Sequence, residues 1–265
     1  MIIKKISAVY FSPTGTTEKA ISAFAEGTGI PLEKIDLTTP KARGSFSRTF
    51  PKDEMVVFGL PVYAGRLPKN IDDFFSGLKG DATPAVAAVT YGNREFDDAL
   101  LELQLRLEER GFIVKAGVTF IGEHTFSRRI ATGRPDASDL ATVAGFGRQA
   151  AESIARDGHS ILTLKGTYPF VAKGSDPANP FYPRIATAES CTRCGLCAEN
   201  CPQGVIDKND FKTIDYARCL HCLRCVKYCP ASAKKATGEE YFKRLPQFET
   251  RLNSNRQEPE LFLPR

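Results

Sequence analysis

The cysteine pattern is the strongest constraint that this sequence carries. All eight cysteines of the 265-residue chain lie between positions 191 and 229. They form two copies of one motif, CTRCGLCAENCP at 191–202 and CLHCLRCVKYCP at 219–230, in which Cys191 aligns with Cys219. Cysteines spread through a secreted chain would indicate disulfides, whereas eight cysteines packed into one short segment indicate metal binding.

Both copies read CxxCxxCxxxCP, a spacing typical of 4Fe–4S clusters. The segment resembles two-cluster bacterial ferredoxins over about 50 residues. The resemblance implies that the cysteine before each proline reaches the other cluster. One cluster is then held by Cys191, Cys194, Cys197 and Cys229, and the other by Cys219, Cys222, Cys225 and Cys201. Zinc sites and a disulfide knot are the alternatives, but zinc favours two separated cysteine pairs.

Strand and helix signals alternate along positions 1–160. Strands are predicted at 2–11, 31–37, 54–60, 84–92 and 112–122, and helices at 17–27, 70–80, 95–110 and 136–157. Such alternation favours a parallel sheet with helices on both faces. Five strands suit the flavodoxin-like, doubly wound order 2-1-3-4-5. The fold class is therefore α/β, with a small α+β ferredoxin-like domain added.

A turn rich in hydroxyl side chains, FSPTGTT at 11–17, joins the first strand to the first helix. Helix N-termini in this position bind phosphate through unpaired backbone N–H groups and a positive dipole end. Hydroxyls at Ser12, Thr14, Thr16 and Thr17 can add hydrogen bonds, and Gly15 allows a close backbone approach. No Walker lysine and no GxGxxG pattern is present. A capping turn with incidental threonines is the alternative interpretation.

Two further loops follow the third and fourth predicted strands, PVYAGRLP at 61–68 and TYGNREFDDA at 90–99. Both lie at carboxyl ends of strands beside the first turn, where such sheets bind ligands. The turn resembles the FMN phosphate loop of flavodoxins, [ST]-x-T-G-x-T, and the resemblance implies an FMN site. Its predicted residues are Ser12, Thr14, Gly15, Thr16, Thr17, Pro61, Val62, Tyr63, Ala64, Gly65, Tyr91, Gly92, Asn93, Arg94 and Phe96.

Four regions are predicted along the chain. They are a flavodoxin-like domain at 1–165, a Pro/Gly-rich linker at 166–184, a ferredoxin domain at 185–236 and a C-terminal tail at 237–265. This order looks like the flavodoxin–ferredoxin fusions of anaerobic bacteria and archaea, the EFR-type ferredoxin family. One departure is that residues 1–165 carry 21 basic and 20 acidic side chains, whereas flavodoxins are usually acidic.

The predicted function is electron transfer between FMN and two 4Fe–4S clusters, and on to redox protein donors and acceptors. A carrier is favoured over an enzyme with its own substrate, so no catalytic residue is assigned; a flavin-dependent reductase of a quinone or other small acceptor is the alternative.

No strongly basic run and no long apolar run is present, so neither nucleic-acid binding nor membrane insertion is expected. A cytoplasmic location is expected, and a homodimer is left open. His221 is a candidate tuner of the second cluster, whereas His124 and His159 are assigned no role.

Overall fold

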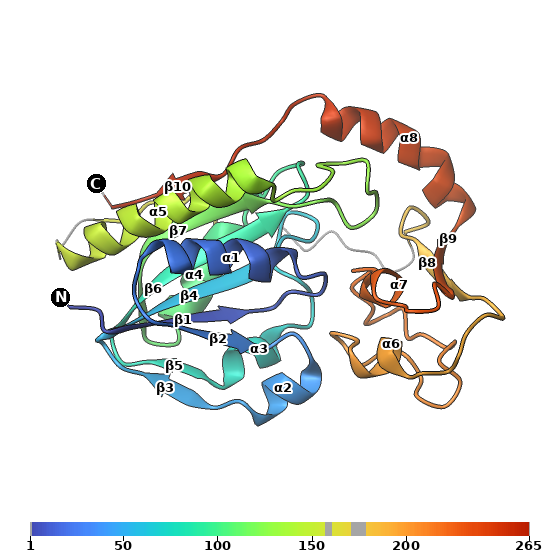
Figure 1. The fold of residues 1–265 in the computed structure, drawn as a ribbon, viewed down its shortest axis with the longest axis horizontal. Helices are drawn as coiled ribbons and strands as arrows, with labels where there is room; N and C mark the ends of the chain where they lie inside the picture. The colour runs from blue at the N-terminus through green and yellow to red at the C-terminus, as the bar shows by residue number, and fades with distance from the viewer. Residues whose placement is uncertain (1, 157–160, 171–178, 265) are drawn as a thin grey trace.

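A six-stranded sheet with helices on both faces lies at the centre of one part of the computed structural model (Figure 1). The structure describes residues 2–156, 161–170 and 179–264. The sheet order is β10-β7-β6-β4-β1-β2. Its strands are β1 (Lys5–Tyr10), β2 (Leu32–Asp36), β4 (Glu54–Pro61), β6 (Thr83–Tyr91), β7 (Phe112–Ile121) and β10 (Glu260–Phe262). All neighbours pair in parallel except β10 and β7, which confirms the predicted order of the five parallel strands.

Two apolar cores lie on opposite faces of this sheet, because the central strands β4 and β6 are buried along their whole length. Helices α1 (Thr16–Gly27) and α5 (Ala137–Ala155) cover one face, with Phe24 and Val143 in its core. On the other face lie α3 (Asp72–Ser76) and α4 (Ala99–Glu108), as Phe74 and Leu103 in the second core show. Helix α2 (Pro40–Ser45) and the short parallel pair β3 (Arg48–Phe50) and β5 (Leu78–Gly80) complete this part.

The C-terminal tail returns to the sheet, a contact that the sequence did not predict. Helix α8 (Glu239–Asn253) runs back from the cysteine motifs toward the sheet, and β10 then lies along its edge (Figure 1). Strand β10 pairs antiparallel with β7, with Leu261 opposite Val118. Phe262 packs against one core and Leu261 and Leu263 against the other. The tail therefore covers the outer edge of β7 in its own chain.

The two cysteine motifs fold as a duplicated unit. The antiparallel strands β8 (Arg184–Thr187) and β9 (Lys234–Thr237) close it, and one short helix follows the second cysteine of each motif, α6 (Leu196–Glu199) and α7 (Arg224–Lys227). Backbone conformation repeats with the sequence, since φ is positive at the matched pairs Arg193/His221, Gly195/Leu223 and Gly204/Ser232. We call residues 184–237 the cysteine part, and residues 2–156 together with β10 the sheet part.

The predicted regional boundaries at 165, 184 and 236 stay predictions. Residues 171–178 of the predicted linker, and His159, lie outside the described residues. Within the described chain, no helix combines the length and the apolar character that crossing a bilayer would need.

Candidate cofactor sites

Each of two small cavities in the cysteine part is lined by four cysteines. Site I is lined by Cys191, Cys194, Cys197 and Cys229, and site II by Cys201, Cys219, Cys222 and Cys225. These are the two interleaved ligand sets that the motif spacing predicts. All eight cysteines are free thiols, so the disulfide alternative has no support here.

The surroundings of the two cysteine sets suit iron–sulfur clusters. Among the described residues, no three His, Cys, Asp or Glu side chains converge closely enough to hold one metal ion. Apolar side chains, Ala198, Val205 and Ile206, pack around the cysteines. Backbone N–H groups also point at sulfur, since Ala233 N–H donates to Cys229 Sγ over 3.2 Å. Apolar packing and N–H···S bonds are two of the means by which proteins tune cluster potentials.

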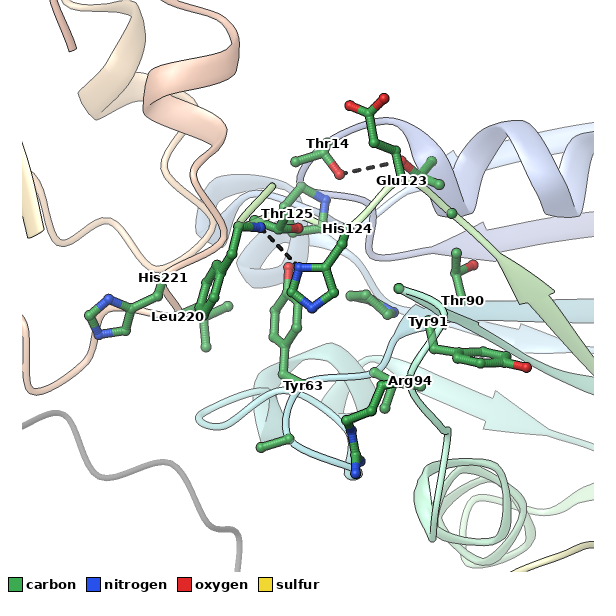
Figure 2. A pocket seen from close by; sticks show the side chains of 18 of the residues that line it. Thr14, Tyr63, Thr90, Tyr91, Arg94, Glu123, His124, Thr125, Leu220 and His221 are labelled. Atoms are coloured by element: carbon green, nitrogen blue, oxygen red, sulfur yellow. Dashed lines mark hydrogen bonds between the residues drawn. The ribbon is translucent and has the colours of Figure 1, made fainter. Parts of the chain in front are cut away.

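A third and larger cavity, of about 250 Å³, lies at the carboxyl ends of the parallel strands. We call it the loop cavity. Its lining comes from the loop after β1, the loop after β4, the loop after β6, the loop after β7, and the cysteine part (Figure 2). Ten predicted FMN residues line it: Thr14, Thr16, Thr17, Pro61, Val62, Tyr63, Ala64, Tyr91, Gly92 and Arg94.

The loop after β1 has free donors at the N-terminus of α1. Gly15 is the N-cap residue with φ +80° and offers no side chain to cap the helix. In the described chain the backbone N–H groups of Thr14, Thr16 and Thr17 have no acceptor. Ser12 does not line the cavity; its buried hydroxyl accepts the N–H of Glu18 over 3.1 Å and so holds the turn. A phosphate at this position would find several unpaired donors and a helix dipole.

Two rings, Tyr63 and His124, face the middle of the loop cavity (Figure 2). His124 Nδ1 accepts the N–H of Phe126 over 3.0 Å, so in the neutral ring Nε2 carries the proton. Burial, with a smaller contribution from Arg94, lowers the pKa of His124 to about 4. Burial also raises the pKa of the Tyr63 phenol well above its usual value. Both rings are therefore uncharged donors at neutral pH.

Five predicted FMN residues do not line the loop cavity. Besides Ser12 these are Gly15, Gly65, Asn93 and Phe96. Gly15 and Gly65 shape their turns at φ near +80°. Asn93 is buried and donates to Leu252 O and Asn255 O of the tail. Phe96 is buried in the sheet core against Tyr91 and Phe262, so its ring cannot reach a ligand in the cavity.

Several lining residues were not predicted from the sequence. The loop after β7 contributes Gly122, Glu123, His124, Thr125 and Phe126. Its position at the carboxyl end of the fifth strand was a usable signal. The remaining missed residues are Pro13, Leu67, Lys69 and Thr90 in the sheet part, and Phe181, Tyr182, Cys219, Leu220, His221 and Phe248 beyond it. Nothing in sequence periodicity could place the last six, because the docking of the cysteine part and of the segments that flank it brings them there.

Helix α7 of the cysteine part contacts the loop after β1 directly. Arg224 Nη1 donates to the carbonyl of Pro13, and Lys227 Nζ donates to the carbonyl of Thr14 over 2.9 Å. Two cations thus lie beside the candidate phosphate position. The turn at 11–17 itself contains only neutral donors, and the added positive charge comes from a segment far away along the chain.

Comparison with known proteins agrees with this arrangement. Residues 190–233 match the family model of the 4Fe-4S dicluster domain. A stretch of 85 residues is 35% identical to the pyruvate synthase subunit PorD of Methanocaldococcus jannaschii, covering 31% of this chain and 86% of that protein. The strand order of the sheet part is that of flavodoxins. This chain joins a sheet with the flavodoxin-like strand order to a 4Fe-4S dicluster domain of the ferredoxin type.

Solved flavodoxins are similar to the sheet part of the fusion. One from the domain Archaea is 15% identical, with a TM-score of 0.40, and covers 57% of this chain and 99% of its own. The two-electron reduced Megasphaera elsdenii flavodoxin is 20% identical, with a TM-score of 0.37, and covers 56% of this chain and 98% of its own. The fusion is an iron–sulfur protein, and its cluster domain gives it an electron-transfer role.

Proposed function

We propose that this fusion relays electrons between FMN in the loop cavity and two 4Fe–4S clusters in sites I and II, and exchanges them with redox proteins. One observation carries the proposal: Cys219 lines both the loop cavity and site II. A ligand in the cavity and a cluster in site II would therefore share a wall. When bound, FMN stores two electrons and releases them singly, and each cubane carries one.

The residues of the loop cavity fit FMN in particular. The unpaired N–H groups of Thr14, Thr16 and Thr17 suit a terminal phosphate, with Arg224 and Lys227 adding positive charge. Gly92 packs against the ring of His124, because a Cβ at Gly92 would lie 2.4 Å from His124 Cδ2. Apolar and aromatic side chains with a few polar groups are typical of cofactor sites. Tyr63 and His124 would orient a flat ring and shield it from water.

The carrier is favoured over the reductase by the outer wall of the loop cavity. Phe126, Phe181 and Phe248 lie along it, with ring centroids of Phe181 and Phe248 5.1 Å apart. A small acceptor needs open space over the flavin, and these three rings take up part of the space along the cavity. Redox proteins can instead exchange single electrons through the clusters.

Cofactor content tests the proposal. Protein purified without oxygen is assayed for iron, sulfide and flavin, and we expect about eight irons and about one FMN per chain. Protein reconstituted with riboflavin in place of FMN is the matched control for the phosphate. Tight binding of FMN but weak binding of riboflavin supports the loop after β1 as the phosphate site. Iron without any flavin affinity would contradict the proposal.

A further inference from the structure

We propose that the cluster in site II is the direct redox partner of the flavin, that Leu220 is the contact residue between them, and that the cluster in site I exchanges electrons with outside proteins. This inference rests on the proposed function and adds an order to its three centres. Sequence symmetry between the two motifs gives no such order, so it must come from how the cysteine part docks.

The first observation is a shared wall. The tripeptide Cys219–Leu220–His221 lines the loop cavity on one side and site II on the other. Leu220 packs against the apolar core of the sheet part. Figure 2 shows Leu220 grouped with Tyr63 and His124, while His221 points away from them. None of the four site I cysteines lines the loop cavity.

The second observation is that most of the docking bonds come from residues flanking the site II cysteines. Arg43 of the sheet part, only 3% exposed, donates to the carbonyl of Pro202 over 2.9 Å. Gln203 donates to the carbonyl of Asn70 over 3.2 Å. Pro202 and Gln203 directly follow Cys201, and Arg224 precedes Cys225. Lys227, which lies between Cys225 of site II and Cys229 of site I, adds a further bond to the carbonyl of Thr14. Most of the docking bonds therefore come from loops that carry site II cysteines.

Site I has the opposite character. Cys194 is exposed, and the neighbouring Leu196 is 43% exposed. A redox protein can approach this cluster without displacing the tail or the sheet part. Site II, in contrast, is less exposed, since Cys201 and Cys222 are both buried.

The electron step is balanced without any bond change between protein atoms. A flavin bound in the loop cavity would give one electron to a cluster held by Cys201, Cys219, Cys222 and Cys225, and its proton would pass to water. The electron would go on to a cluster held by Cys191, Cys194, Cys197 and Cys229, and from there to an external one-electron redox protein. The same transfers would run backward from a one-electron donor.

The internal repeat supplies a matched pair of variants for the test. Leu220 in site II corresponds to Thr192 in site I when the two motifs are aligned on Cys219 and Cys191. Leu220→Lys and Thr192→Lys each add one positive charge beside one cluster. The added charge raises the reduction potential of that cluster, and this shift identifies the EPR signal of that cluster. Leu220→Lys should also weaken FMN binding by about tenfold, because it places a charge on the cavity wall, whereas Thr192→Lys should leave FMN affinity unchanged.

The full-length protein is then titrated by EPR with FMN removed and with FMN restored. Thr192→Lys identifies the EPR signal of the cluster in site I, so the other signal belongs to the cluster in site II. We expect FMN to shift the reduction potential of the cluster in site II. This comparison needs only the wild type and Thr192→Lys, so it stands even if Leu220→Lys does not fold. A shift confined to the cluster marked by Thr192→Lys, or no shift in either cluster, would overturn the order while leaving FMN and cluster binding intact. Protein that binds no FMN would instead overturn the proposed function.

Discussion

At residue 15 the backbone has φ +80°, and a Cβ there would lie 3.0 Å from the hydroxyl of Tyr228. Gly15→Ala should therefore strain the turn before α1 and press it against the cysteine part. A left-handed conformation costs a residue with a Cβ about 1–2 kcal/mol. We expect FMN affinity to fall by about fivefold or more, because the strain acts on the N–H groups that would face the phosphate. Titration of flavin-free protein with FMN measures this loss of FMN affinity.

Gly29→Ala is the control for Gly15→Ala. Gly29 has φ +72°, but a Cβ there has no neighbour within 4 Å. It should lower stability by about 1 kcal/mol without changing FMN affinity. Equal effects of the two substitutions on FMN binding would show that the turn at Gly15 is not the phosphate site.

The pKa of His124 predicts a loss of stability in acid. Its pKa is about 4 in the folded protein, against about 6.5 in an unfolded chain. Between these values the unfolded chain binds more protons, so stability falls as pH decreases from 6.5 toward 4. From pH 7 to pH 5 the loss should be about 2 kcal/mol. His124→Asn should remove most of this pH dependence, as measured by thermal unfolding of flavin-free protein. An unchanged pH dependence in His124→Asn would contradict the assignment.

Among the elements, α7 is predicted to stabilise bound FMN from outside the sheet part. Lys227→Gln removes a charge that lies against the loop after β1. One charge at such a surface contributes on the order of 1 kcal/mol, so FMN should bind about threefold to tenfold more weakly at low salt. The difference should shrink as salt is added. Lys235→Gln, an exposed change on β9, is the control. If both variants bind FMN equally well, α7 has no such role.

A second prediction at the scale of elements concerns the tail. Asn93 holds the tail against the loop after β6. The Asn93 side chain donates to Leu252 O and Asn255 O and accepts the N–H of Gln257. Asn93→Ala leaves these groups unpaired, which costs about 1–3 kcal/mol. We expect faster hydrogen exchange in α8 and β10 but FMN affinity within about twofold of the wild type. Asn255→Ala, which keeps the carbonyl that Asn93 uses, is the control. A large loss of FMN affinity in Asn93→Ala would instead favour the direct role that the sequence predicted.

These elements show what sequence can and cannot predict here. The order of the five parallel strands was predictable because β4 and β6 are continuous apolar runs separated by clear helices. The cysteines that line sites I and II are the two sets that the resemblance to two-cluster ferredoxins implies. Strand β10 was not, because so short a strand carries no periodicity and its pairing with β7 depends on the path of α8. His124 looked isolated in the sequence, since its neighbours in the cavity come from other loops.

On the scale of the whole molecule, docking of the cysteine part completes the loop cavity. The sheet part supplies the turn before α1 and the loops around Tyr63 and His124. The cysteine part supplies Cys219, Leu220 and the two cations of α7. The tail then adds Phe248 and pairs with β7. The chain thus brings its candidate flavin site and one cluster site together without a second subunit.

The dependence of the electron-transfer rate on protein concentration tests the proposed relay within one chain most directly. Protein loaded with FMN and clusters is mixed rapidly with a one-electron reductant, and electron redistribution between clusters and flavin is followed by absorbance at several dilutions. We expect a first-order rate that does not change with protein concentration, because donor and acceptor share one cavity wall. A rate that rises in proportion to protein concentration would mean that electrons cross between separate molecules, and it would contradict a relay within one chain.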